Sequence, residues 1–176
     1  MKLSDIPSNL DAATRAELLS CDPGKELSAV AYWLRGQLVH VGFTKGFVFP
    51  GPELAIEVPQ IYPKGVGETK ADRIDPNDLI DVAYSAGVIA GMRQASRGKT
   101  YGTKIYRPRE WKKQVPKHIN HHRIMQRLTL EEIACLPPET VERIAVAING
   151  GPYSWQGHNL LDAVGIGLVY LKRIRP

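Results

Sequence analysis

The spacing of apolar residues changes once along this chain, from a strand pattern to a helix pattern, and that change limits the folds open to it. The first third holds four short β-rich or apolar runs, at residues 18–22, 28–34, 37–43 and 54–58. Arg35-Gly36 separates the second run from the third at the spacing of a hairpin turn. From residue 75 to 94, apolar residues recur every three or four positions, which predicts a helix.

More helices are expected in the last third of the chain. The sequence Thr129-Leu130-Glu131-Glu132 has the form of a capping box, and Pro137-Pro138 predicts the end of the helix that it starts. Two further helices are expected at 139–148 and 158–172. Because the strands come first and the helices later, we predict an α/β fold with a mixed sheet covered by helices. A length of 176 residues fits one domain, here 17–176, and residues 1–16 are polar enough to form an N-terminal arm.

Charge is concentrated in one segment. Residues 97–127 hold ten Lys and Arg and a single acid, for a net charge of +9, whereas the rest of the chain holds 13 cations against 17 acids, for −4. A segregated basic block of this kind is typical of a protein with a polyanionic partner. Tyr101, Tyr106 and Trp111 lie among these charges and favour nucleic acid, since bases stack on aromatic rings. A solvated loop is the alternative interpretation.

Several protein classes are excluded by simple features. The uncharged run at 163–171 is far too short to cross a bilayer, and the N-terminus lacks the apolar stretch of a secretory signal. Two cysteines, Cys21 and Cys135, are too few for a zinc site or a disulfide framework. We therefore expect a soluble protein in a reducing, intracellular compartment.

Three carboxylates stand where burial is expected. Asp22 ends an apolar run, and Glu57 and Asp162 each lie inside one. An isolated buried carboxylate is costly, and a cluster of them repels itself unless a cation compensates. Mg²⁺ or Mn²⁺ takes oxygen ligands, and two such ions can bind both the attacking water and the leaving oxygen of a phosphodiester. Each acid alone also has an ordinary interpretation: Asp22 opens a turn, Glu57 lies at an exposed strand edge or pairs with a lysine, and Asp162 faces solvent.

His158 and Asn159 precede Asp162 by four and three residues, so on a helix both would share its face. His158 could bind a metal ion, position water or transfer a proton. The alternatives are that His158 begins the helix and that Asn159 caps it.

These residues carry a resemblance to a known family. The segments LLSCDPG at 18–24, AIE at 55–57 and HNLLDAVGIGL at 158–168 resemble the RuvC family of Holliday junction resolvases, most of all its bacteriophage and plasmid-type members. The resemblance extends over roughly residues 17 to 173. It implies a ribonuclease H-like fold with a mixed five-stranded sheet, a homodimer, and Mg²⁺-dependent cutting of four-way DNA junctions.

The same resemblance implies roles for individual residues. It makes Asp22, Glu57 and Asp162 metal ligands and catalytic residues for two Mg²⁺ ions, with Mn²⁺ as a substitute. The family commonly has an Asp or His one turn before its last acid; here Asn159 or His158 would fill that place, and His158 would also be catalytic. The expected DNA contacts lie in the basic segment: Lys112, Lys113, Lys117, Arg123 and Trp111.

The resemblance also implies a dimer interface and a cellular location, and it leaves several alternative functions open. The dimer seam is expected near residues 124–136, and the small side chains at 83–91 are expected to pack on the chain's own sheet. The expected location is the cytoplasm of a bacterium or of a bacteriophage-infected host cell, with no membrane partner. The rival functions are a related nuclease acting on forks, branched DNA or RNA–DNA hybrids, a junction-binding protein without catalysis, and a basic RNA-binding module.

Overall fold

A computed structural model describes residues 16–45, 53–59, 75–97, 102–113, 115–148 and 157–175. Its centre is a five-stranded mixed sheet in the order β3-β2-β1-β4-β5. The strands are β1 Leu18–Asp22, β2 Ser28–Leu34, β3 Gln37–Thr44, β4 Glu53–Glu57 and β5 Thr103–Tyr106. The predicted fold class, an α/β fold with a mixed five-stranded sheet flanked by helices, is confirmed.

The pairing of the strands brings two of the three acids to one edge. β1, β2 and β3 form an antiparallel meander, whereas β4 runs parallel to β1 and β5 runs parallel to β4. Cys21 of β1 is in register with Ile56 of β4. Each is followed by an acid that ends its strand, so Asp22 and Glu57 lie side by side at the carboxyl edge of the sheet.

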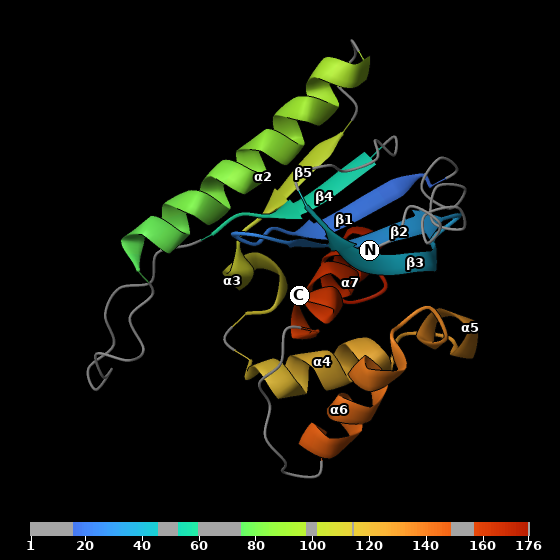
Figure 1. Ribbon diagram of the computed structural model, residues 1–176. Helices are drawn as coiled ribbons and strands as arrows, with labels where there is room; N and C mark the ends of the chain where they lie inside the picture. Colours follow the sequence, from blue (N-terminus) through green and yellow to red (C-terminus); the bar gives the residue numbers. More distant parts are fainter. Residues whose placement is uncertain are drawn as a thin grey trace, which may run out of the picture.

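Helices cover both faces of this sheet (Figure 1). The long helix α2 lies on one face, and α7 lies on the other with α4 and α6 beyond it. The helices are α2 Pro76–Arg97, α3 Pro108–Trp111, α4 Lys117–Met125, α5 Leu130–Ile133, α6 Pro138–Ile148 and α7 His158–Tyr170. None of the helices in these described ranges is long and apolar enough to cross a membrane.

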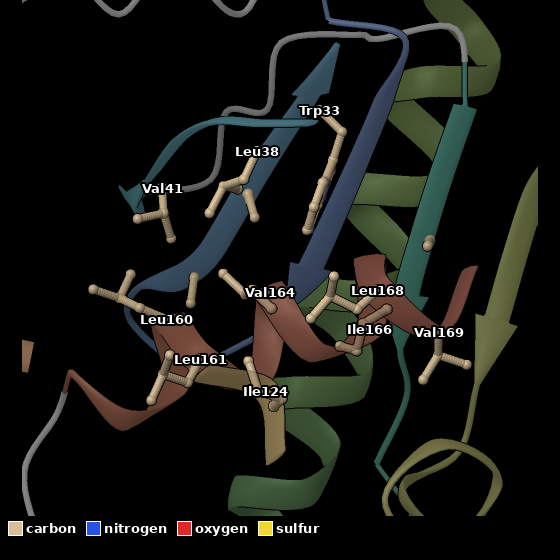
Figure 2. Close-up of a cluster of buried hydrophobic side chains, with 14 of the residues drawn as sticks. Trp33, Leu38, Val41, Ile124, Leu160, Leu161, Val164, Ile166, Leu168 and Val169 are labelled. Atoms are coloured by element: carbon tan, nitrogen blue, oxygen red, sulfur yellow. The ribbon is translucent and has the colours of Figure 1, made fainter. Parts of the chain in front are cut away.

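The larger core lies between the sheet and α7. Figure 2 shows side chains of β2, β3 and α4 meeting the apolar side chains of α7. Trp33 is fully buried there, and its indole Nε1 donates a hydrogen bond to Ser20 Oγ over 2.8 Å. On the opposite face, Ala86 and Ile89 of α2 pack against the sheet. Of the small residues expected there, Ala83, Gly87 and Gly91 are exposed instead.

The basic segment has more structure than its charge suggested. It contains the edge strand β5 and the helices α3 and α4. The capping box is confirmed, because Thr129 Oγ1 accepts from the Glu132 amide and Glu132 Oε2 accepts from the Thr129 amide. The helix that it begins, however, ends at Ile133, well before the two prolines.

Two predictions about the ends and the seam are not tested. Residues 1–15 of the predicted arm lie outside the described residues, and Ala16 is buried. In the predicted dimer seam, Ile124 and Leu136 are buried in the chain's own core, whereas Leu130 is 82% exposed. The domain boundary and the homodimer therefore stay predictions.

Candidate active site

Three sequence-remote acids are brought together at the carboxyl edge of β1 and β4. Asp22 and Glu57 end their strands, and Asp162 stands in the second turn of α7, which packs mainly on β1 and β2. The Asp162 side chain is 3% exposed and that of Glu57 is 13% exposed. The apolar residues around each acid bury it, as their sequence patterns predict.

The acids act on one another electrostatically. Burial raises the pKa of Asp22 well above its ordinary value, and the negative charges of Asp162 and Glu57 raise it further. Burial likewise raises the pKa of Glu57, against the opposing effect of a neighbouring ammonium group, that of Lys112. The three carboxyl groups thus form one site with an excess of negative charge.

Two lysines partly neutralise this charge. Lys112 Nζ lies 3.4 Å from Glu57 Oε2 and 3.9 Å from Asp162 Oδ2, and Lys117 Nζ lies 3.0 Å from Asp162 Oδ2. Burial favours the neutral amine of Lys112, but the charges of Asp162 and Glu57 hold its pKa above the ordinary value. Both lysines were predicted as DNA contacts; the structure places their ammonium groups among the acids.

Asp162 is held from both sides. His121 Nε2 lies 2.8 Å from Asp162 Oδ1, while Lys117 holds Oδ2. Burial by itself would raise the pKa of Asp162, but the hydrogen bond from His121 and the charge of Lys112 hold it well below its usual range. Burial lowers the pKa of His121, so its imidazole is neutral near pH 7 and donates its Nε2 proton to the carboxylate.

Trp111, one of the predicted DNA contacts, is buried beside the acids. The residue is 3% exposed and packs in the core, and its indole Nε1 donates a hydrogen bond to Glu57 Oε2. A buried ring has no face for a base to stack on. The indole orients Glu57 here, and a contact of Trp111 with DNA stays a prediction.

His158 and Asn159 begin α7, four and three residues before Asp162 on the same helix. Lys117 Nζ lies 3.1 Å from His158 Nδ1, and because an ammonium group can only donate, Nδ1 is the acceptor. Burial and the charge of Lys117 lower the pKa of His158 to about 4. His158 is therefore neutral at pH 7. Asn159 is half-buried.

Two other predicted DNA contacts lie at the surface. Lys113 follows α3 and is exposed, with a left-handed backbone φ of 55°. Arg123 is exposed on α4.

His121 is a site residue that the sequence analysis missed. It is fully buried in spite of its polar neighbours His122 and Arg123. The available signal was its spacing: His121 lies three residues before Ile124 and four after Lys117, so all three share one face of a helix. The high charge of the segment hides this signal, because a basic block predicts an exposed surface rather than a buried helix face.

The carboxylate oxygens of the site suit a hard divalent cation. Here the carboxylates of Glu57 and Asp162 form hydrogen bonds and ion pairs with other side chains of the protein. No group of three or more His, Cys, Asp or Glu side chains within the described ranges has the arrangement of a formed metal site. The site nevertheless offers carboxylate oxygens, the ligands preferred by Mg²⁺ and Mn²⁺, with mutual repulsion that added positive charge would relieve. The residues therefore fit such ions in kind and in charge.

Comparison with known proteins decides the fold. The sequence matches no protein-family model and no curated protein. Among solved structures, the chain is similar to T. thermophilus RuvC in complex with a Holliday junction substrate, with a TM-score of 0.51, 16% identity, and coverage of 88% of this chain and 91% of that one. This chain has a ribonuclease H-like fold. A second structure, Thermus thermophilus RuvC, matches at 12% identity over 90% of this chain and 98% of the other; its TM-score of 0.37 carries no argument.

Proposed function

We propose that this protein is a metal-dependent endonuclease that hydrolyses phosphodiesters in four-way DNA junctions. The observation that carries the proposal is the convergence of Asp22, Glu57 and Asp162, from two strands and a helix, into one electrostatically coupled site. Support for the substrate comes from the basic segment and from the fold shared with a RuvC bound to a Holliday junction.

The proposal gives each acid a role. Asp22, Glu57 and Asp162 would hold two Mg²⁺ ions, with Mn²⁺ as a substitute and with Asn159 or His158 completing the ligand set. When bound, the ions would polarise the scissile phosphate and lower the pKa of the attacking water. The lysines among the acids would then lose part of their role as neutralising charges.

The remaining side chains would orient and protonate. Trp111 fixes Glu57, and His121 fixes Asp162, which limits the motion of both carboxylates. His158 is neutral at pH 7 and would accept or return a proton during hydrolysis. Lys112 and Lys117 would contact a bound phosphate, because each already stands beside the acids with an ammonium group.

The wider context follows from the same proposal. Lys113 and Arg123, which are exposed, would contact the junction backbone without reading sequence. A homodimer would place two sites on opposite strands, and the cytoplasm of a bacterium or an infected host cell would supply the DNA.

The test is substitution of single acids. Asp22→Asn or Asp162→Asn should abolish Mg²⁺-dependent cutting of a labelled four-way junction and leave its binding within about threefold, since phosphate contacts supply most of the affinity. Asp22→Asn should not destabilise the fold. The site raises the pKa of the Asp22 carboxyl and therefore already disfavours its charged form, which asparagine lacks. Asp78→Asn on the exposed face of α2 is the matched control and should cut normally. Loss of binding together with cutting would contradict these roles.

A panel of substrates separates this activity from its relatives. The same preparation is incubated with a four-way junction, a fork, an RNA–DNA hybrid and a plain duplex. Preferred cutting of the fork or the hybrid would assign the alternative nuclease activities.

One observation favours a second candidate, junction binding without cleavage. The ammonium groups of Lys112 and Lys117 already pair with the carboxylates that would have to bind metal. Tight junction binding with no nicking in either Mg²⁺ or Mn²⁺ would establish this second function.

A further inference from the structure

A strongly basic cavity lies away from the candidate active site. It has a volume of about 340 Å³ and opens between the end of α4 and the turn that follows α7. Five cationic side chains line it: Arg123, Arg127, Lys172, Arg173 and Arg175. Among the described residues, only Arg173 of these five pairs with a carboxylate, that of Glu132. The other four charges together attract an anion.

The two helices connect this cavity to the candidate active site. They run in the same direction, since Lys117 and His121 near the start of α4 contact Asp162, and Arg127 just beyond α4 contacts Arg173 just beyond α7. The end of α7 at Tyr170 lies eight residues past Asp162, about 12 Å along the axis at 1.5 Å per residue. That length is on the order of a few nucleotides of one DNA strand.

The turn after α7 does not require a lysine side chain at position 172. Lys172 has a left-handed φ of 58°, at a position after the helix that glycine usually occupies. The amides of Lys172 and Arg173 close the helix end by bonding Val169 O and Leu168 O. Glycine would make the same bonds without steric cost. Lysine brings a cation to the rim of the cavity instead.

Hydrogen bonds of the Arg173 guanidinium fix the geometry of the cavity. Its Nη2 donates to Arg127 O over 2.6 Å and to Glu132 Oε2 over 2.7 Å. Its Nη1 donates to Glu132 Oε1 over 2.6 Å and to Gly36 O over 3.0 Å. The turn after α7 is thereby tied to the end of α4, which fixes the spacing of Arg127 and Lys172 before any ligand binds.

We infer that this cavity is a phosphate-binding site for the DNA backbone, engaging a phosphate a few nucleotides from the bond at the active site. The inference rests on the proposed function for the identity of the ligand. Arg127 and Lys172 bind the phosphate oxygens, and the contact sets how the strand lies along α4. This site extends the DNA interface beyond the basic segment to the C-terminal turn.

The experiment measures binding of a fluorescent four-way junction at a series of NaCl concentrations, in EDTA so that no cutting occurs. Lys172→Gly and Arg127→Gln should each weaken binding about three- to tenfold at about 0.1 M NaCl and reduce the slope of log K against log salt by about 0.9. Arg143→Gln, on the exposed side of α6, removes the same charge elsewhere and should leave binding and slope unchanged. Thermal unfolding should show Lys172→Gly at least as stable as the wild type.

The outcomes separate this inference from the proposed function. If the Lys172→Gly and Arg127→Gln variants bind the junction as tightly as the wild type and with the same salt dependence, the inference about the cavity is wrong. The nuclease proposal is unaffected by that result. An equal loss for Arg143→Gln also overturns it, because the effect is then one of net charge. A wild type that binds no DNA contradicts both proposals.

Discussion

Two glycines in α7 determine how closely this helix approaches its neighbours. A Cβ on Gly165 would lie 2.6 Å from both Ile124 Cδ1 and Trp111 Cζ3, and one on Gly167 would lie 2.4 Å from the Trp33 ring. Glycine costs about 1 kcal/mol against alanine inside a helix. That cost is offset here because close packing lets α7 bring Asp162 to the carboxylates at the strand ends.

Gly167→Ala should therefore lower the free energy of unfolding by about 1–3 kcal/mol, since overpacking forces the buried Trp33 ring to shift. Urea denaturation followed by tryptophan fluorescence measures the change. Gly87→Ala on α2 is the control: a Cβ there meets nothing within 4 Å, so the same substitution should raise stability by up to about 1 kcal/mol. Equal effects at both positions would show that packing at Gly167 is unimportant.

The burial of the three acids can be predicted from the sequence, whereas the burial of His121 cannot. Asp22, Glu57 and Asp162 stand out because each is a charge inside or at the end of an apolar run, and burial is a property of the run itself. His121 lies in a polar segment, and it is buried because α4 packs against α6 and α7.

At the scale of elements, the hairpin between β2 and β3 is set by its two turn residues. Arg35 has φ 51° and Gly36 has φ 75°, so both adopt the left-handed conformation of a two-residue hairpin turn. The glycine suits this turn, whereas arginine adopts it at a steric cost. The Arg35 amide also donates to Glu17 Oε2 over 2.9 Å.

Arg35→Asn should stabilise the protein by a few tenths to about 1 kcal/mol, because asparagine tolerates a left-handed φ and keeps the backbone amide. The midpoint of thermal unfolding should rise accordingly. Gly36→Ala tests the same argument in the opposite direction and should lower the midpoint. A fall in the midpoint of Arg35→Asn would show that the arginine side chain matters more than the turn geometry.

The basic segment shows where element prediction failed. β5 is an edge strand whose residues are nearly all exposed, so it has no buried alternating face to reveal it. α3 is only one turn long. Both elements form because β4 and α7 offer them surfaces to pack on, which no local pattern records.

At the scale of the whole molecule, Glu132 and Arg173 join three distant parts of the chain. Glu132 is 1% exposed, and besides Arg173 it accepts from the amides of Leu38 and Thr129. Burial by itself would raise the pKa of Glu132, but the Arg173 guanidinium and the amide donors hold it below its ordinary value. The pair thus connects β3, the start of α5 and the turn after α7.

The lowered pKa of Glu132 makes the stability of the fold depend on pH. Because folding lowers the pKa of Glu132, its contribution to stability is present above the ordinary glutamate pKa of 4.5 and is lost as pH falls through the lower folded value. Glu132→Gln should cost roughly 3 kcal/mol at pH 7, because it leaves Arg173 without its buried partner. Urea unfolding at a series of pH values should show that this deficit shrinks below pH 4.5. Glu142→Gln, exposed on α6, should show no deficit at either end; a deficit for Glu132→Gln that persists in acid would contradict the linkage.

Local chemistry in the sequence was sufficient for the four early strands, the hairpin turn, the capping box and the three buried acids, because each depends on residues a few positions apart. The position of the cations was decided only by tertiary structure. Lys112 and Lys117 look like part of a solvated charge run, yet the packing of α3 and α4 against α7 turns both toward the carboxylates. Electrostatic attraction acts through space, so which charges meet depends on the fold as a whole.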